Sequence, residues 1–381
     1  GLMGRIAVKD LVESWEVDEV VIADRDTELA HQVAEVLNSP KVAVVYADVT
    51  DHEGLVKVLR GADAVLNSVH YYFNLDVMRA CLEARVPYVD LGGLFHTTRK
   101  QLELHEAFAS AGITAVLGMG SAPGVPNVQS RYIADHLDTI EYIRIYDGIA
   151  APESDELFFG YAIPTIIDEM TMPPMVYRDG DFQARPPLSE EEDYWFTPPI
   201  GLRRCHLSLH SEVATIPLTF RDKGVRECFF KINYWGMSPR AFAKVKLLAD
   251  LGFAGSEPVD VNGIQVRPRD VLVRLLAPYV PPLDAFVQRP ADPTDWKKEI
   301  VTEARGTVDG QEVVYRLGTL ANPGSLPTGV APSIVAQWLA AGRIARRGVF
   351  PPEAVIEPEP FFRELAQRGI ETRVTVTEPI S

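Results

Sequence analysis

The chain has 381 residues, of which 46% are hydrophobic and 24% are charged, and its formal net charge at pH 7 is −16. This composition is typical of a soluble globular protein that is long enough for two domains. The acidic excess argues against a nucleic-acid-binding protein, because no basic surplus exists to displace phosphate counterions. No apolar run reaches the length of a membrane span. The cysteines Cys81, Cys205 and Cys228 lack the spacing of metal ligands, so we expect a cytoplasmic protein with free thiols and no metal site.

The first 24 residues have the pattern of a dinucleotide-binding βαβ unit. Gly1-Leu2-Met3-Gly4 opens an amphipathic run, and Val20-Val21-Ile22-Ala23-Asp24 is an apolar strand that ends in a carboxylate. In such a unit the glycines let backbone N–H groups approach a pyrophosphate at a helix N-terminus, and an acid about 20 residues later binds the adenosine ribose. The first strand of the unit and the first glycine of its pattern are expected to lie before residue 1.

Short helices and strands then alternate as far as residue 125. Helices are predicted over 27–37, from after Asp51 through Leu59, over 74–84 and over 102–111, and strands over 41–46, 64–67, 86–90 and 113–117. This alternation indicates a parallel sheet covered by helices on both faces. Because ligands of such sheets bind beyond the carboxyl ends of the strands, the opening turn and the loops 67–74, 90–96 and 118–127 are candidate binding loops.

From about Ile140 the pattern changes to that of an α+β domain. Strands are predicted over 142–149, 212–220, 225–235, 300–307 and 312–317, helices over 239–251, 269–277 and 330–346, a hairpin over 259–266, and an irregular stretch over 151–201. The pairs Asn262-Gly263 and Asp309-Gly310 are typical of tight hairpin turns.

Five ordered segments carry a family resemblance: the opening Gly1-Leu2-Met3-Gly4, Tyr88-Val89-Asp90-Leu91-Gly92-Gly93, Ala122-Pro123-Gly124 with Asn127, Val266-Arg267-Pro268-Arg269-Asp270-Val271-Leu272, and Gly348-Val349-Phe350-Pro351-Pro352-Glu353. Together they resemble the saccharopine dehydrogenase superfamily and, within it, the bacterial L-lysine 6-dehydrogenase-like branch. The segment 206–215 differs from its Gly- and Thr-rich equivalent in lysine dehydrogenases, at a place where substrate contacts are plausible.

The resemblance implies an α/β fold with an N-terminal Rossmann-type parallel sheet and an inserted α+β domain for substrate binding and dimerisation. The first domain would span residues 1–125 plus 330–365, with a C-terminal helix returning to it, and the inserted domain would span 126–329. The implied chemistry is NAD(P)-linked oxidation at a carbon that bears an amine, or the reverse reduction. The implied assembly is a homodimer or a higher homo-oligomer.

The residues expected to contact the dinucleotide lie at the opening turn and at the strand ends. They are Gly1, Leu2, Met3, Gly4, Asp24, Arg25, Asp48, Val49, Asn67, Ser68 and Gly92. The carboxylate of Asp24 favours a ribose with free hydroxyls, so NAD is expected; the neighbouring Arg25 is able to contact a 2′-phosphate, which makes NADP the alternative.

Removing a proton from an ammonium group requires a base, and Asp90 is the first candidate because it ends a strand beside two glycines. The alternative is that Asp90 caps its own loop through the backbone of Gly92 or Gly93. His210 and Tyr71 are the other catalytic candidates, against the alternatives of a surface histidine beside an acid and of plain aromatic packing.

The expected substrate contacts are Tyr72, Gly93, Asn127, Glu212 and Arg221. Arg221 would clamp an α-carboxylate, although the segment 221–224 also has the composition of a solvated turn.

We expect oxidative deamination of L-lysine at the ε-carbon as the activity. One alternative is the reductive coupling of an amine with an oxo acid, as in saccharopine or carboxynorspermidine formation. That reaction calls for carboxylate-binding arginines, for which Arg203, Arg204, Arg221 and Arg226 are available. Another alternative is a dinucleotide-binding homologue without turnover.

Overall fold

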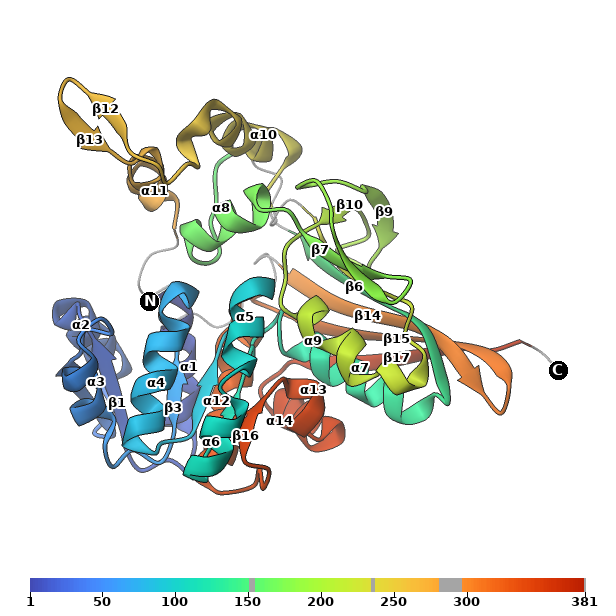
Figure 1. Cartoon of the computed structure of the whole chain (residues 1–381), viewed down its shortest axis with the longest axis horizontal. Helices are drawn as coiled ribbons and strands as arrows, with labels where there is room; N and C mark the ends of the chain where they lie inside the picture. The colour runs from blue at the N-terminus through green and yellow to red at the C-terminus, as the bar shows by residue number, and fades with distance from the viewer. Residues whose placement is uncertain (151–154, 234–236, 281–296, 380–381) are drawn as a thin grey trace.

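Two β-sheet systems organise the computed structural model, which describes residues 1–150, 155–233, 237–280 and 297–379 (Figure 1). The first system is parallel and includes the N-terminal third of the chain, and the second is a large mixed sheet formed by the middle and the end. The fold is therefore α/β with a Rossmann-like parallel sheet, as predicted.

The N-terminal unit is built on parallel strands. Four of them pair in the order β16-β5-β4-β3, and β1 pairs with β2 as a separate parallel ribbon. The strands are β1 (Val20–Asp24), β2 (Val42–Tyr46), β3 (Val65–Asn67), β4 (Tyr88–Asp90), β5 (Thr114–Val116) and β16 (Gly348–Phe350). The carboxyl ends of β3, β4 and β5 consequently meet at one edge, where a ligand of this sheet type binds.

Helices connect these strands, and aspartates fix where two of them begin. Asp26 Oδ1 accepts a hydrogen bond from Leu29 N at 3.0 Å, and Asp51 Oδ1 accepts one from Gly54 N at 3.1 Å. The helices are α1 (Leu2–Glu13), α2 (Thr27–Leu37), α3 (His52–Leu59), α4 (Asn74–Ala84), α5 (Leu94–Leu102) and α6 (His105–Ala111), with a 3₁₀ turn η1 (Tyr71–Phe73) before α4.

The end of the chain returns to the N-terminal unit, as the family resemblance implies. Helix α12 (Leu326–Ala340) packs along α1, and β16 then extends the parallel sheet beside β5. Ile6 of α1 and Val330, Ile334 and Trp338 of α12 belong to one buried cluster. The domain boundaries at residues 125 and 330 stay a prediction.

The second sheet has nine strands among the described residues. Its main path is β17-β15-β14-β6-β11-β10-β9, with β7 paired to β11 and β8 paired to β7, and only the β6–β11 pair is parallel. The strands are β6 (Thr139–Ala150), β7 (Met175–Arg178), β8 (Asp181–Ala184), β9 (Glu192–Trp195), β10 (Leu202–Leu207), β11 (Glu227–Ile232), β14 (Lys297–Val308), β15 (Gln311–Ala321) and β17 (Glu371–Thr377).

Helices pack against this sheet and against its junction with the N-terminal unit (Figure 1). They are α7 (Val125–His136), α8 (Ile163–Thr171), α9 (Glu212–Thr219), α13 (Pro352–Val355) and α14 (Pro358–Gln367). Ile133, Ile145, Ile166 and Ile216 belong to the largest buried cluster, which fills the space between α7, α8, α9 and the sheet.

A separate segment, residues 239–279, projects from the second sheet; we call it the arm. It contains α10 (Pro239–Leu248), the hairpin β12 (Val259–Val261) and β13 (Ile264–Val266), and α11 (Pro268–Leu276). The hairpin predicted from Asn262-Gly263 is confirmed.

Three predicted elements are wrong. Residues 212–219 form helix α9 and not a strand, the stretch 151–201 contains α8 and strands β7 to β9, and the last residues of the expected loop 90–96 belong to helix α5. The β-branched run Val213 to Ile216 reads as a strand, but all its side chains are buried, so packing overrides the local preference.

Candidate active site

The opening turn of α1 lies against the carboxyl end of β3. A Cβ atom on Gly4 would stand 2.8 Å from Ser68 Oγ, so the turn approaches the loop after β3 closely here, and the space in front of Gly1 is open. The strand tips nearby carry Asp24, whose Oδ1 accepts a hydrogen bond from Asp26 N at 2.9 Å, and the exposed Arg25. A glycine turn at a helix N-terminus beside a strand-tip carboxylate fits a nicotinamide dinucleotide.

The other expected dinucleotide contacts divide into two groups. Asp48 and Val49 follow β2 and are half-buried, and hydrogen bonds from Thr50 lower the pKa of Asp48. Asn67, in contrast, is engaged within the protein. Its Nδ2 donates to Asn74 Oδ1 and to Tyr88 Oη, both at 2.9 Å. Asp48 and Val49 thus remain available to a ligand, while the amide of Asn67 supports the loops behind it.

Asp90 is fully buried, and its two carboxylate oxygens accept five hydrogen bonds. Oδ1 accepts from Gly92 N at 3.0 Å and from Gly118 N at 2.6 Å. Oδ2 accepts from the side chains of Tyr88, Gln101 and Asn74 at 2.8, 2.6 and 3.2 Å. Burial raises the pKa of Asp90, and the backbone bond from Gly118 is the largest opposing effect. This geometry favours the loop-capping alternative over a base in contact with substrate.

The loop after β4, which Asp90 holds, packs against the loop after β5 and the start of α9. Gly92 has φ 117°, which disfavours any L side chain, and a Cβ there would stand 2.6 Å from Pro123 Cγ and 3.5 Å from Ser211 Oγ. The loops after β4 and β5 and the start of α9 therefore meet at one place. Gly93 lies in the same loop and precedes α5.

Two expected substrate contacts lie away from this meeting point. Asn127 is buried at the start of α7, where its Oδ1 accepts from Gly124 N at 2.9 Å and its Nδ2 donates to Glu353 Oε2 at 2.8 Å. Arg221 is exposed in a 3₁₀ turn after α9. The amide of Asn127 thus hydrogen-bonds within the protein. Arg221 lies in a solvated turn, which was the alternative to a carboxylate clamp.

Tyr71 and Tyr72 both bind one aspartate of α8. Their hydroxyl groups donate to Asp168 Oδ2 at 2.7 and 2.6 Å, and Arg269 Nη1 lies 2.8 Å from Asp168 Oδ1. Burial lowers the pKa of the neighbouring His70 to about 4, so this imidazole is neutral. The two tyrosines connect the end of β3 with α8 and with the arm.

His210 is buried, which excludes the surface-histidine alternative. Its Nδ1 lies 3.1 Å from Glu212 Oε2, its Nε2 lies 3.7 Å from Glu169 Oε1, and its ring stacks on Phe230 with centroids 3.6 Å apart. Burial acts to lower the pKa of His210, but the carboxylates, Glu212 foremost, outweigh it and the pKa is raised. The imidazole therefore lies between two carboxylates, which favour its protonated form.

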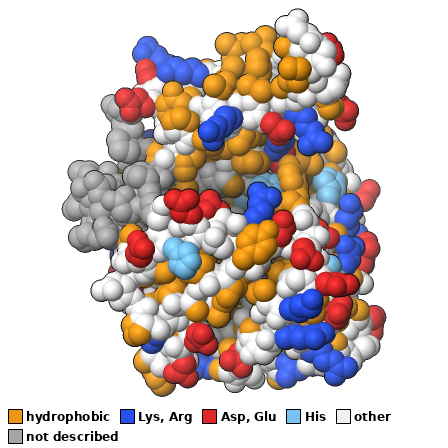
Figure 2. Space-filling model, turned by 90° about the vertical axis from the view of Figure 1, so that its left-hand side faces the viewer, with side chains coloured by type: hydrophobic (Ala, Val, Ile, Leu, Met, Phe, Trp, Pro, Cys, Tyr) orange, Lys and Arg blue, Asp and Glu red, His pale blue; other side chains and the backbone are white. Residues whose placement is uncertain are grey.

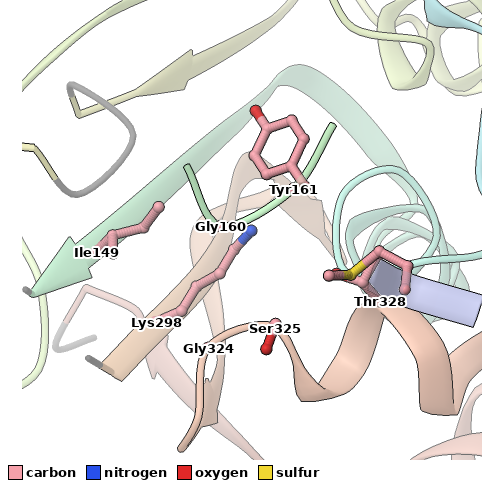
Figure 3. Close-up of a pocket in the computed structure, with 8 residues that line it drawn as sticks. Ile149, Gly160, Tyr161, Lys298, Gly324, Ser325 and Thr328 are labelled. Carbon is pink, nitrogen blue, oxygen red and sulfur yellow. The ribbon is translucent and has the colours of Figure 1, made fainter. Parts of the chain in front are cut away.

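A pocket near His210 and its two carboxylates is lined by residues from both parts of the molecule. Met3 of α1 and Thr328 of α12 line one side, and Tyr161 and Lys298 line the other. Figure 3 shows the Lys298 amino group extending toward Gly160 and Tyr161. Tyr161 donates a short hydrogen bond to Glu169 Oε2, and Lys298 Nζ lies 2.7 Å from Asp147 Oδ2.

We call Asp147, Glu169, His210, Glu212 and Lys298 the buried charged cluster. It contains three carboxylates and two cationic side chains, each at most 12% exposed. Together with Tyr161 it supplies a cation and a proton donor to the pocket wall, which suits chemistry on a substrate that carries a carboxylate and a reacting carbonyl.

The sequence reasoning missed Tyr161, Glu169 and Lys298. One signal was available: Asp168-Glu169 interrupt the apolar spacing Ile163, Ile166, Ile167 and Met170 of a helix, and both acids are buried. Within the described ranges no group of His, Cys, Asp and Glu is arranged to hold a metal ion. None of the described helices is both long and apolar enough to cross a membrane.

Two family models match the chain one after the other. The saccharopine dehydrogenase NADP-binding domain matches residues 1–116, and the saccharopine dehydrogenase C-terminal domain matches residues 120–370.

Curated relatives and a solved structure agree with this. Carboxyaminopropylagmatine dehydrogenase of Synechocystis is 26% identical over 100% of this chain and 96% of its own length. Carboxynorspermidine synthase of Vibrio alginolyticus is 26% identical over 88% and 83%. The saccharopine dehydrogenase (L-Glu forming) of Saccharomyces cerevisiae is similar in fold, with a TM-score of 0.71 at 16% identity over 99% and 98% of the two chains.

The family and these relatives are NAD(P)-dependent dehydrogenases that act on amino-containing substrates. The expectation of an oxidoreductase is thereby confirmed, and the alternative of a homologue without turnover loses its support. With both family models spread over nearly its whole length and the predicted fold in place, this chain belongs to the saccharopine dehydrogenase family.

Proposed function

We propose that this protein joins a primary amine to the aldehyde group of an amino acid and reduces the product to a secondary amine that carries a carboxyl group. The observation that carries the proposal is the pocket between Met3 and Lys298, in which the side chains of Lys298 and Tyr161 lie near the opening turn of α1, the candidate site for the dinucleotide. The names of the two curated relatives, which describe carboxyl-bearing polyamine compounds, support it. This was the alternative to L-lysine deamination in the sequence reasoning.

The reaction consumes one proton beyond those of the substrates. In balanced form, R–NH₃⁺, R′–CHO, NAD(P)H and H⁺ give R–NH₂⁺–CH₂–R′, NAD(P)⁺ and water. The C–O bond of the amine–aldehyde adduct breaks as water leaves, so the site needs a proton donor at that oxygen. A bound nicotinamide supplies the hydride, and the remaining tasks fall to the protein.

Lys298 is the proposed anchor for the carboxylate of the aldehyde substrate. Its side chain is 12% exposed and its ammonium group is held by Asp147, so its position is fixed before substrate arrives. The four arginines considered from the sequence lie elsewhere. Arg203 and Arg204 are on β10 near the sheet edge, Arg226 pairs with Asp179, and Arg221 is exposed. Tyr161 is the proposed proton donor, because its side chain lines the same pocket and its hydroxyl is hydrogen-bonded to Glu169.

For the cofactor we propose NADP, in place of the NAD expected from Asp24. The description of the matching N-terminal family model supports this, and so does the exposed Arg25 at the tip of β1. We expect Arg25→Ala to raise the KM for NADPH ~10-fold, the effect of losing about 1.4 kcal/mol of contact with a 2′-phosphate, and to leave the KM for NADH unchanged. Steady-state kinetics with both cofactors will measure this, and an equal effect on the two KM values would contradict it.

The activity is tested by following NADPH oxidation with pairs of a primary amine and an amino acid aldehyde. We expect turnover that requires both substrates, with 1,3-diaminopropane and agmatine as the first amines. The matched experiment supplies L-lysine with NADP⁺ or NAD⁺ at alkaline pH. Reduction of the dinucleotide by lysine alone, without turnover of any amine–aldehyde pair, would instead establish the lysine deamination expected from the sequence.

We also propose that the protein is a cytoplasmic homo-oligomer. The described cysteines are free and buried, which suits a reducing compartment. Figure 2 shows hydrophobic side chains gathered at the top of the molecule, and the arm contributes the exposed Leu251, Ile264 and Leu275. An apolar surface of this kind supports self-association. Light scattering coupled to gel filtration will measure the mass in solution.

A further inference from the structure

Four polar side chains form a line that leads from the pocket into the protein interior. Tyr161 lines the pocket and donates to Glu169 Oε2. The other oxygen of Glu169 lies 3.7 Å from His210 Nε2, and His210 Nδ1 lies 3.1 Å from Glu212 Oε2. Glu169, His210 and Glu212 are each at most 4% exposed, so bulk water does not reach the inner part of this line.

The charged groups around His210 come from several elements. Glu212 begins α9, Glu169 belongs to α8 and Asp147 belongs to β6, and Lys298 on β14 lies beyond Asp147. On β11, Phe230 covers one face of the ring, and Cys228 is a buried thiol. Because the nearest groups are carboxylates, the pKa of His210 is raised, which favours the protonated imidazole. His210 is also buried, so a proton on its ring has no direct path to solvent.

We propose that His210 is a positioning residue that returns a proton to Tyr161 through Glu169 during the reductive reaction. The inference rests on the proposed function for its chemical step. His210 does not line the pocket, so it acts through Glu169 and Tyr161, which lie between them.

The proton balance of the step is simple. Tyr161 gives its hydroxyl proton to the oxygen of the amine–aldehyde adduct, the C–O bond breaks, and water leaves. Glu169 carries a proton from His210 Nε2 to the phenolic oxygen, and His210 becomes a neutral imidazole that Glu212 holds through Nδ1. This transfer requires the 3.7 Å separation between Glu169 and His210 to shorten to hydrogen-bond length.

The relay avoids a costly alternative. If Tyr161 acted alone, its phenolate would remain beside the carboxylate of Glu169, which places two negative charges next to each other in a partly buried site. With the relay, the group that loses its charge is His210, and the two carboxylates around it keep a hydrogen-bond donor.

The test is the pH profile of kcat for NADPH oxidation in the full-length protein. Reduction needs protonated His210, so kcat should fall as pH rises through the pKa of His210. In Glu212→Gln the largest charge that raises this pKa is lost, and the fall should move to lower pH. Glu212→Asp should restore much of the wild-type profile. Glu169→Gln should lower kcat ~100-fold, the lower end of acid–base catalysis, with the KM for NADPH unchanged.

Glu303→Gln is the matched control. Glu303 lies on β14 and receives a hydrogen bond from Tyr142, and by strand alternation it faces the side of the sheet opposite to Asp147. Its pH profile should match that of the wild type. Tyr161→Phe keeps the cluster intact and should lower kcat as Glu169→Gln does, which covers the case that a cluster variant fails to fold.

A second measurement separates the relay from the proposed reaction. NMR of ¹⁵N-histidine-labelled protein, with His210 assigned through His210→Gln, follows its protonation without substrate. A lower titration point in Glu212→Gln than in the wild type supports the relay, and identical titration overturns it whatever the substrate is. An unmoved kcat profile with a shifted NMR titration also overturns the relay. Absence of amine–aldehyde turnover in the wild type overturns the proposed function. The NMR titration then tests by itself whether Glu212 controls the protonation of His210.

Discussion

Lys298→Met should raise the KM for the amino acid aldehyde about 100-fold while the KM for the dinucleotide stays unchanged. The ammonium group is the cationic side chain on the described pocket wall, and loss of one charge-assisted contact to a carboxylate costs about 3 kcal/mol. Aldehydes that lack the carboxylate should react equally with both forms. Steady-state kinetics with matched aldehydes will measure the ratio, and an equal loss for both aldehydes would remove Lys298 as the anchor.

The same substitution should also destabilise the fold, because it leaves Asp147 buried without its cation. Asp147 is 1% exposed, and an unpaired buried charge costs about 3–5 kcal/mol. The double variant Lys298→Met with Asp147→Asn is the control. It should recover most of the free energy of unfolding in urea but none of the aldehyde affinity. Recovery of both would mean that the pair has a structural role only.

Asp90→Asn should lower the free energy of unfolding by at least ~3 kcal/mol. In either orientation of the new amide, its NH₂ group faces two or more of the donors that now bind the carboxylate, and a hydrogen bond to a charged group is worth about 1.5–3 kcal/mol. Urea unfolding of the two forms will measure the difference.

The control for this variant is Asp63→Asn, a change of the same chemistry at an exposed position before β3, which should leave stability unchanged. Turnover decides the role of Asp90. If Asp90→Asn keeps its stability but loses turnover ~100-fold, Asp90 is the base that the sequence predicts. If stability falls as expected, its contribution is to hold the loops after β4 and β5.

The N-terminal unit was predictable because its signals are local. Each strand there is a short apolar run followed by a polar loop, and caps such as Asp26 and Asp51 mark where helices begin. The segment of α9 was wrongly predicted as a strand because residues 212–217 are buried on all sides. No apolar stripe therefore distinguishes a helix from a strand in this part of the sequence.

The site was harder to predict because its members are distant in sequence. His210 and Glu212 are near neighbours and were found, but Tyr161, Glu169 and Lys298 come from a loop, a helix and a strand start that meet only in the folded chain. Asp90 was identified at the correct edge of the sheet, yet its role depends on five donors from one strand, two loops and two helices, which no spacing reveals.

Asp168 and Glu169 are adjacent on α8, but they serve different partners. Asp168 accepts hydrogen bonds from the two tyrosines that follow β3, and Glu169 accepts one from Tyr161 and lies next to His210. A stiff helical turn cannot shift one of these carboxylates without the other. The end of β3 and the buried charged cluster are therefore joined through two adjacent residues of one helix, so a displacement of α8 moves both sets of contacts at once.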